Sequence, residues 1–562
     1  MGKNNNSKYQ YFYSTLFAIF LILPNLLLIF IGEDSAVGSL IKKIAFLLIS
    51  LSIVLIPLVF IKPKYYGFFV IIFFPIIIFE TYHVIHFKAP SSEEIINSVF
   101  QTNYNEAKEI LQSNIIFVLF SLITFILFFW ILNKIDKSFI VNRKIKKLIL
   151  IFFACTFIGL GTRNLRLALK KSAKRSEIIQ SFNYSFKVQM QKNFPIGFFI
   201  KSLEIFEGIK KRRTYLSTIK NFSFNAIKKD TLSEKEIYIL VIGETARKHN
   251  FSIYNYNRKT SPNLDTIKNL MVFNNVKSNS NVTSLSIPFM LTRATPKKSK
   301  IKFTEPTLIN VFKETGFHTY WVSNQQIATG SVFGLYSQTS DSYFNVSKSL
   351  DSAGFDENVL PVFDEILRDS FKKKFIIIHT IGSHFRYNYR YPNNFKNFLP
   401  TLEKGLSIES TTNYNKKEEI INSYDNSLLY TDFILSELIK KTKKENVNSF
   451  LFYISDHGEN LFDTEKNKLL HGYEIPTKFE TEIPLLIWTS NKYNLNHPKI
   501  IESLHKNTNN KIATTNTFYT LSDMSNITYP NFEKQHSFAN KKFDTLQERF
   551  FYSVNKSVLK LD

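Results

Sequence analysis

Three short stretches of the sequence place side chains that can bind metal ions directly after strongly apolar runs. Glu244 follows "IYILVIG", Ser383 and His384 follow "KFIIIHTIG", and Asp456 and His457 follow "SFLFYIS". An Asp-His pair at the end of a strand is more often a turn than a ligand pair, but three such ends at one edge favour a ligand set. Oxygen and nitrogen donors without sulfur suit Zn²⁺ or Mn²⁺, and the histidines favour zinc.

A metal site of this kind can activate either a water molecule or a side-chain hydroxyl. The stretch "SNSNVTSLSIPFMLT" supplies hydroxyls after a predicted strand and at the start of a predicted helix. A hydroxyl at that position would lie at the positive end of the helix dipole, which favours bound phosphate. Thr283 and Ser284 are the candidates, although either could simply cap the helix.

The elements that must position these residues are short apolar runs alternating with helical segments, from about residue 236 onward. Such alternation predicts an α/β domain around a mostly parallel sheet, in which ligands bind beyond the carboxyl ends of the strands. The predicted strands are "IYILVIG", "MVFNNV", "HTYWVS", "KFIIIHTIG", "SFLFYIS" and "IPLLIWT", and the helical candidates include 306–315, 357–369 and 418–443.

The amino-terminal part of the chain has a different character, because it carries long uncharged apolar runs. Spanning a bilayer takes about 20 predominantly apolar residues. Five runs approach that length, and the fifth is short enough to be a buried helix instead. They are 11–31, 44–61, 65–86, 113–132 and 148–162.

Basic residues in the short connections set the expected orientation. Lysines precede the first run and join the second to the third, and "NKIDKSFIVNRKIKK" joins the fourth to the fifth. The positive-inside rule puts these connections in the cytoplasm, so five spans would leave the later residues outside. We therefore expect a transmembrane domain over 1–165, a linker with membrane-surface helices over 166–235, and a catalytic domain over 236–562 in the periplasm.

Composition narrows the class of partner. The net charge of +25 suits nucleic acid or an anionic membrane surface. No zinc-finger spacing or RNP-like motif is present, so we expect no nucleic-acid partner. The single cysteine, Cys155, excludes an intramolecular disulfide and a cysteine-based metal site.

Several motifs together resemble the lipid A phosphoethanolamine transferases, the family that includes colistin-resistance enzymes. They are "GETARKHNFSIYNYNRKTSPNL", "NVTSLSIPFMLT", "HTIGSH", "SDHGENL" and "LLHGYEIP", with "QTNYNEA" in the amino-terminal part. The resemblance covers essentially the whole chain. It implies an α-helical membrane domain of about five transmembrane helices in the bacterial inner membrane, followed by an α/β alkaline-phosphatase-like (sulfatase-like) domain.

The resemblance also implies roles for individual residues. Thr283 matches the family's nucleophile, which zinc also binds. The remaining matches are zinc ligands at Glu244, Asp456 and His457, phosphate or second-metal histidines at His384 and His471, and substrate contacts at Glu106, His379 and Gln325. The implied reaction moves phosphoethanolamine from phosphatidylethanolamine to Thr283 and then to lipid A or its core sugars. The resemblance also implies a role in polymyxin resistance.

Departures from the family pattern and rival functions remain. The usual C-G-T-x-T-A around the nucleophile is replaced, since Asn279, Ser280 and Asn281 precede Val282, and the family's disulfides cannot form. A phosphoglycerol transferase or a phosphatase of the same fold is the nearest alternative. A rival of another class is a non-catalytic membrane or transport protein that uses Glu80, His83 and His86 as a polar pathway.

Overall fold

The computed structural model describes most of the chain in two compact units, Met1–Phe206 and Glu207–Asp562. Each unit is described by itself. The described residues are 2–31, 40–71, 73–87, 90–91, 96, 115–171, 175–230, 235–325, 332–347, 354–403, 413–464, 467–473, 475–553 and 557–562.

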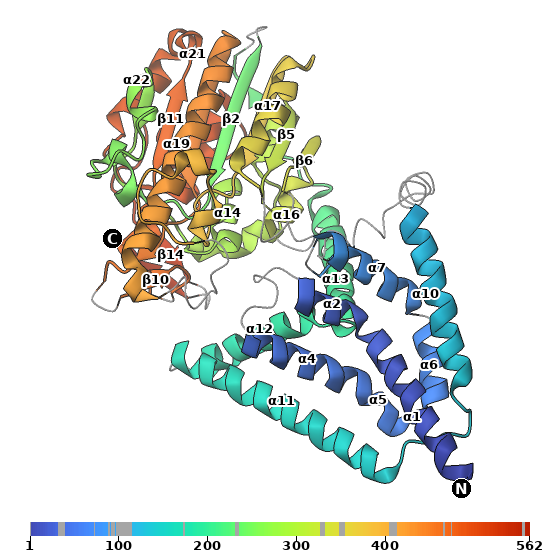
Figure 1. Ribbon diagram of the computed structural model, residues 1–562. Coiled ribbons are helices and arrows are strands. Elements are labelled where there is room, and N and C mark those ends of the chain that lie inside the picture. Colours follow the sequence, from blue (N-terminus) through green and yellow to red (C-terminus); the bar gives the residue numbers. More distant parts are fainter. Residues whose placement is uncertain are drawn as a thin grey trace. The chain divides into compact units, whose positions relative to one another are not determined.

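The first unit is helical (Figure 1). Aromatic and aliphatic side chains of α1, α7 and α10 meet in its largest core, where the rings of Phe17 and Phe128 lie 5.5 Å apart. Its helices are α1 (Gly2–Leu21), α2 (Leu23–Ile31), α4 (Leu40–Leu55), α5 (Pro57–Phe60), α6 (Pro63–Ile71), α7 (Phe74–Phe87), α10 (Ile115–Lys134), α11 (Arg143–Lys171), α12 (Arg175–Lys192) and, continuing into the second unit, α13 (Ile196–Ile219).

Prolines interrupt three of the expected apolar spans. Pro24, Pro57 and Pro75 each stand in the first turn of a new helix, where a residue without an N–H is tolerated but cannot continue the preceding helix. The run at 65–86, expected as one span, is therefore divided between α6 and α7. Helices α1 and α2 form a pair bent by 59°.

In the part of the chain that the structure describes, fewer helices than the five expected spans are long and apolar enough to cross a membrane. Among the described residues, Leu40–Phe60 and Arg143–Leu169 are long and apolar enough to cross, and the bent pair Lys8–Leu21 and Leu23–Ile31 could add a third. Phe74–Ile85 and Val118–Lys134 are shorter apolar helices. The fifth run is longer than its apolar letters suggest, because α11 extends from Arg143 to Lys171. The five-span count stays an expectation.

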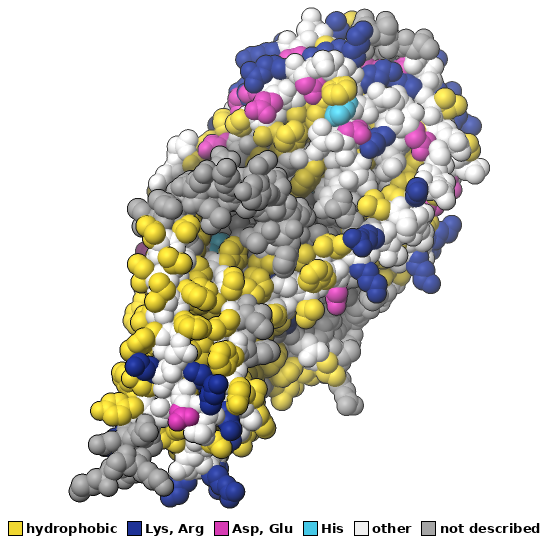
Figure 2. Space-filling model, turned by 90° about the vertical axis from the view of Figure 1, so that its right-hand side faces the viewer, with side chains coloured by type: hydrophobic (Ala, Val, Ile, Leu, Met, Phe, Trp, Pro, Cys, Tyr) yellow, Lys and Arg dark blue, Asp and Glu magenta, His cyan; other side chains and the backbone are white. Residues whose placement is uncertain are grey.

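The outward faces of the first unit suit a nonpolar solvent. Exposed apolar residues gather on α10 and α11, among them Leu122, Ile126, Trp130, Leu148 and Ile158. Figure 2 shows hydrophobic side chains massed over the helical unit, with Lys and Arg near its end. Apolar surface of this extent is typical of a lipid-facing helix bundle.

The second unit is built on a seven-stranded sheet in the order β3-β11-β8-β2-β7-β5-β6. The strands β8, β2, β7, β5 and β6 are parallel to one another, whereas β11 pairs antiparallel with both β8 and β3. The prediction of a mostly parallel sheet is confirmed, with one reversed strand. The bounds are β2 (Glu236–Gly243), β3 (Leu270–Val272), β5 (His318–Ser323), β6 (Ser342–Asn345), β7 (Lys373–His379), β8 (Asn448–Ser455) and β11 (Leu485–Thr489).

Helices cover both faces of this sheet (Figure 1). Alternate residues of β2 enter opposite cores: Tyr238, Leu240 and Ile242 on one face, and Ile237 and Ile239 on the other. Helices α17 (Val359–Arg368) and α19 (Lys417–Lys444) pack on the second face, and α14 (Thr283–Leu291), α15 (Leu308–Glu314) and α23 (Thr517–Met524) on the first. A strand buried on both faces reads as a continuous apolar run, which is why these strands were predictable.

Two-strand pairings complete the second unit. The expected strand "MVFNNV" is divided between β3 and β4 (Val276–Lys277), and β4 leaves the main sheet to pair with β12 (Ile512–Ala513). The other pairs are β1 (Ile227–Lys228) with β13 (Ile527–Thr528), β9 (Asn460–Leu461) with β10 (Leu469–Leu470), and β14 (Phe550–Tyr552) with β15 (Val558–Lys560).

Candidate metal and transfer site

Glu244 is presented by a sharp turn at the carboxyl end of β2. A Cβ at Gly243 would lie 2.6 Å from the Tyr453 hydroxyl, so only glycine fits there. Thr245 has a positive φ of 59°, an unusual conformation for a β-branched residue. The Thr245 N–H donates to Oδ1 of Asp456 at 2.9 Å, and its hydroxyl donates to Oε1 of Glu244 at 2.7 Å. The turn therefore ties one carboxylate to the loop that carries the other.

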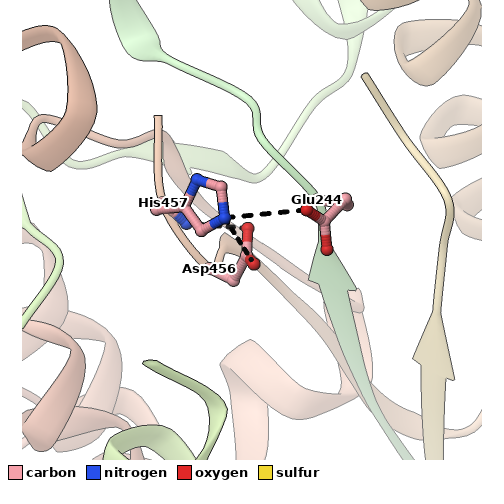
Figure 3. Close-up of side chains that lie close together, drawn as sticks. All are labelled: Glu244, Asp456 and His457. Atoms are coloured by element: carbon pink, nitrogen blue, oxygen red, sulfur yellow. Dashed lines mark hydrogen bonds and ion pairs between the residues drawn. The ribbon is translucent and has the colours of Figure 1, made fainter. Parts of the chain in front are cut away.

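Asp456 and His457 follow β8, the neighbour of β2 in the sheet. The Asp456 N–H donates to the carbonyl of Gly243 at 3.0 Å, and Oδ1 of Asp456 also accepts from the His457 N–H at 2.7 Å. Among the described residues, no group donates a hydrogen bond to Oδ2 of Asp456, which lies 3.3 Å from Nε2 of His457. One oxygen of Asp456 is thus fixed by backbone groups, and the other faces the imidazole (Figure 3).

The His457 ring is oriented by its other nitrogen. Nδ1 of His457 lies 2.9 Å from the carbonyl of Gly458 and must donate to it, so the neutral ring keeps a lone pair on Nε2. That nitrogen lies 3.6 Å from Oε1 of Glu244. Ligand atoms of Glu244, Asp456 and His457 all lie within 4.8 Å of one another, and all three side chains are buried. This is a donor set that a divalent metal ion fits.

The pKa shifts of the three groups show that no positive charge within the cluster balances its two carboxyl groups. Burial and the charge of Glu244 raise the pKa of Asp456 well above its usual value. Although burial opposes it, His457, His384 and two hydrogen bonds lower the pKa of Glu244 to about 2. Burial, reinforced by His471, lowers the pKa of His457 to about 3. At neutral pH a neutral imidazole therefore faces two crowded carboxyl groups, and a bound cation would relieve their repulsion.

Thr283 lies against the same cluster. It is the first residue of α14, after Val282 in extended conformation, as predicted for a hydroxyl at the mouth of a helix. Its Oγ1 is 3.2 Å from each carboxylate oxygen of Glu244 and 3.4 Å from Nε2 of His457. The structure thus brings together Glu244, Asp456, His457 and Thr283 from three separate parts of the chain.

The two outer histidines differ from each other. His384 comes from a loop five residues beyond the end of β7, rather than from the strand end itself, and burial lowers its pKa. The ring of His471 lies 4.1 Å from the ring of His457, and its Nδ1 is 3.2 Å from Oε1 of Glu459. Burial alone would lower the pKa of His471, but the Glu459 carboxylate raises it to about 9.

The other residues predicted for the site are Gln325, His379 and Glu106, and each has a different outcome. The Gln325 amide donates to Oε2 of Glu244 and to the carbonyl of Thr380, each at 2.8 Å. His379 is the last residue of β7 and is fully buried, with its ring 6.0 Å from that of Trp321, and burial lowers its pKa to about 4. The close ligand group found among the described residues does not include His379. Glu106 lies outside the described residues.

Sequence reasoning missed two residues that support the site. Glu459, which orients His471, stands two positions after His457 in "SDHGEN", and that position was the available signal. Arg247 is buried and forms an ion pair with Asp463, and it also donates to the carbonyl of Glu459 at 3.1 Å. It joins the loop after β2 to the loop after β8. The letters "GETAR" placed Arg247 near the site but did not reveal its partners.

Comparisons with known proteins agree with this geometry. Residues 236–527 match the family model described as Sulfatase, and residues 66–164 match the model described as Phosphoethanolamine transferase EptA/EptB. The chain is 34% identical over 328 residues to phosphoethanolamine transferase EptC of Escherichia coli (strain K12), covering 56% of this chain and 55% of that protein. The match thus spans about half the length of this curated relative.

Solved structures extend the likeness to the fold. The crystal structure of the C-terminal periplasmic domain of Escherichia coli EptC, in complex with Zn, is 33% identical with a TM-score of 0.53, covering 60% of this chain and 95% of that one. The integral membrane lipooligosaccharide phosphoethanolamine transferase A of Neisseria meningitidis, 21% identical with a TM-score of 0.51 over 94% of this chain and 97% of that one, shows the fold alone. The chain therefore belongs to the sulfatase family, with an amino-terminal part similar to the phosphoethanolamine transferases EptA and EptB.

Proposed function

We propose that this protein transfers phosphoethanolamine from phosphatidylethanolamine to lipid A or its core sugars, with Thr283 as the nucleophile. One observation carries the proposal: the Thr283 hydroxyl lies 3.2 Å from both oxygens of Glu244 and 3.4 Å from Nε2 of His457. A hydroxyl inside a metal-ligand cluster is the arrangement that covalent transfer requires and water activation does not. The likeness to curated phosphoethanolamine transferases supports the transferred group, and the donor and acceptor are part of the proposal.

The residues fit zinc. Glu244, Asp456 and His457 would hold the ion, together with the Thr283 oxygen. Oδ2 of Asp456, which accepts no hydrogen bond from the described residues, is an available donor. When bound, zinc lowers the pKa of an adjacent hydroxyl and neutralises charge on the phosphoryl oxygens. The Zn complex of the Escherichia coli EptC domain supports this choice of metal.

The chain's own groups then define two displacements. The Thr283 oxygen attacks the phosphorus of phosphatidylethanolamine, the bond to the diacylglycerol oxygen breaks, and diacylglycerol leaves with a proton. An oxygen of the acceptor next attacks the phosphorus on Thr283, and the threonine hydroxyl is restored. In this proposal His384 and His471 contact the phosphoryl oxygens in both steps. His471, whose pKa is about 9, is cationic at neutral pH and suits an anionic group.

Location follows the same proposal. We infer that the first unit anchors the protein in the inner membrane and that the second unit faces the periplasm, as expected from the basic connections between apolar runs. Both lipids lie in anionic bilayers, which suits a chain of net charge +25. The helical bounds of Arg143–Leu169 support a crossing immediately before the linker at 166–235.

The rival transport function loses its main support. The Glu80 carboxylate accepts hydrogen bonds from the Ser91 N–H at 3.0 Å and the Ser91 hydroxyl at 2.5 Å. Both of its oxygens are thereby used to hold a neighbouring segment. Nothing comparable to the Glu244 cluster is found among the described residues of the first unit.

Trapping the intermediate tests the proposal. Wild-type protein incubated with phosphatidylethanolamine and no acceptor should gain one phosphoethanolamine on the peptide containing Thr283, measured by mass spectrometry. Thr283→Ala should keep most of its zinc and gain nothing, whereas Ser284→Ala, the matched neighbour, should be labelled normally. Lipid A from cells making Thr283→Ala should lack the modification. Near-normal lipid modification by Thr283→Ala would mean that the nucleophile lies elsewhere.

A further inference from the structure

The segment that leads into Thr283 is buried although its side chains are polar. Ser278, Asn279, Ser280 and Asn281 are each 2% exposed or less. They connect β4 to α14, and Thr283 follows two residues after Asn281. A buried polar group is stable only when it is hydrogen bonded, so the partners of these residues determine where the segment lies.

Asn279 uses both ends of its amide. Its Oδ1 accepts from the Thr514 hydroxyl at 2.7 Å and from the Thr515 N–H at 2.9 Å. Its Nδ2 donates to the carbonyl of Phe550 at 2.6 Å. The backbone of Asn279 is also paired, because its carbonyl accepts from the Tyr552 N–H at 2.7 Å.

The same distant strand holds the next residue and the helix itself. The Ser280 hydroxyl donates to the carbonyl of Tyr552 at 2.9 Å. The ring of Tyr552 lies 5.8 Å from the ring of Phe289, a buried residue of α14. Residues 278–281, between β4 and α14, are called the lead-in here. Strand β14 contacts the lead-in at two consecutive residues, Asn279 and Ser280, and it contacts α14 at Phe289.

Strand β14 is fixed in turn. It pairs antiparallel with β15, and the two strands, Phe550–Tyr552 and Val558–Lys560, are called the late hairpin here. The guanidinium of buried Arg549 donates to the carbonyls of Asn275 and Ile512 at 3.0 and 3.2 Å. The residue next to the late hairpin is thereby tied to Asn275, just before β4.

The other side of the lead-in is held by the metal-ligand loop. The hydroxyls of Ser278 and Ser286 both donate to the carbonyl of Asp456, at 2.5 and 2.6 Å. The Asn281 amide donates to Oε1 of Glu480 at 2.6 Å. Thr283 thus lies on a segment fixed to the ligand loop on one side and to the late hairpin on the other.

We propose that Asn279 and the late hairpin are positioning elements for Thr283, so that rupture of their hydrogen bonds misplaces the nucleophile while Glu244, Asp456 and His457 stay in place. The inference rests on the proposed function. A fully satisfied buried network specifies one geometry. Displacement of a reacting atom by about 1 Å can cost about 100-fold in rate. Glu244, Asp456 and His457 make their own contacts through β2 and β8 and do not depend on Asn279.

Asn279→Asp breaks the link selectively. A carboxylate still accepts from Thr514 and Thr515, but it places an oxygen against the Phe550 carbonyl, where the amide N–H donated. We expect kcat for transfer, and the rate of Thr283 labelling without acceptor, to fall by about 10- to 100-fold. KM for phosphatidylethanolamine and the amount of bound zinc should remain close to wild type. All rates are measured well below the unfolding temperature.

Asn274→Asp is the matched control. Exposed Asn274 donates through Nδ2 to Oδ1 of Asn509 at 2.7 Å, so it makes the same kind of bond from the other side of β4, at the surface. It should leave kcat unchanged. If Asn279→Asp does not yield folded protein, Ser280→Ala removes only the bond to Tyr552, and a several-fold fall in kcat with normal zinc supports the inference.

Two results would overturn it. One is a wild-type kcat in folded Asn279→Asp, or in folded Ser280→Ala where that variant replaces it, and the other is a loss of activity that tracks lost zinc. Failure of the proposed function is a different result, because then wild type itself gains no label on Thr283. The inference fails alone when wild type is labelled and Asn279→Asp is labelled at the same rate.

Discussion

Strand β2 carries a buried glutamate at each end, and the two have opposite surroundings. Glu236, at the amino end, lies 3.0 Å from the Lys228 ammonium and 3.8 Å from that of Lys373, and it accepts from the Tyr238 hydroxyl. Glu244 follows β2 at the carboxyl end, beside a second carboxyl group. Among the described residues, the ring nitrogen of His457 is the only Lys, Arg or His nitrogen within 4 Å of the carboxyl groups of Glu244 and Asp456, and that ring is neutral.

The comparison separates a structural charge from a functional one. Both carboxylates are fully or almost fully buried, and a buried charge needs compensation. At the amino end lysines of the chain provide it, so that end is complete. At the carboxyl end the nearest ring nitrogen belongs to a neutral imidazole, and in the proposed function a bound cation supplies the positive charge there.

The largest effect should come from Asp456→Asn. The amide keeps the Oδ1 acceptor for two N–H groups but replaces the oxygen that faces His457. We expect zinc affinity and transfer to fall by more than about 100-fold, because a ligand matters more than a group that merely orients one. The metal-free variant should be at least as stable as metal-free wild type, because burial and Glu244 already disfavour ionised Asp456. Zinc titration and thermal unfolding with and without metal measure both.

Glu236→Gln should give the opposite pattern. It leaves the almost buried Lys228 ammonium with Asp230 and the carbonyl of Ser525 as partners. We expect the free energy of unfolding to fall by about 2–3 kcal/mol, somewhat less than for a pair without other partners. Zinc affinity should be unchanged. An unchanged free energy of unfolding, or a loss of bound zinc, in Glu236→Gln would contradict the distinction between the two ends of β2.

A pH titration sharpens the comparison at the amino end. His497 is buried there, with Nε2 3.2 Å from the Asn448 amide nitrogen, and burial lowers its pKa to about 4 from an ordinary 6.5. Between those values the unfolded chain binds the extra proton, so stability is lost as pH falls from 6.5 towards 4. Replacing His497 by Gln should flatten that slope. Equal slopes in the two proteins would show that His497 does not contribute.

The smallest effect is expected at Glu482, near the carboxyl edge but paired with cations. Its carboxylate lies 3.2 Å from the Lys248 ammonium and 2.9 Å from the His249 ring, and it is partly exposed. Despite its burial, these partners lower its pKa to about 2. Glu482→Gln should cost less than about 1 kcal/mol and leave zinc bound. The loss should disappear as pH falls from 4.5 through 2, because the wild-type carboxylate is then protonated too.

The residues that could be predicted from sequence are those whose position follows from local pattern. Glu244, Asp456 and His457 come directly after strands buried on both faces, and such strands are recognisable as apolar runs. The predicted start of a helix made Thr283 and Ser284 the candidate hydroxyls, and the family resemblance chose Thr283. The family pattern of letters then separated these residues from ordinary turn residues.

The residues that could not be predicted depend on contacts between distant segments. His384 was predicted as a site residue, but its arrival through a loop was not, since β7 ends at His379. The role of Glu459 arises only when His471 folds against it, and the partners of Asn279 lie 235 and 271 residues further along the chain. The breaks in the apolar runs have a local cause, because Pro24, Pro57 and Pro75 are visible in the sequence. Hydropathy alone does not reveal these breaks, since it takes no account of the backbone N–H that proline lacks.

The late hairpin has a consequence for the dynamics of the protein. A two-stranded hairpin is marginally stable by itself, and segments with few cooperative neighbours open at lower free energy than the sheet that they contact. Sub-global opening of 549–562 would release the lead-in to Thr283 while β2 and β8 stay folded. Amide hydrogen exchange should therefore report similar opening free energies for Tyr552 and Leu561, both below that of Leu240. For a small fraction of the time, the enzyme would therefore have a folded sheet and a bound metal ion but would be unable to react.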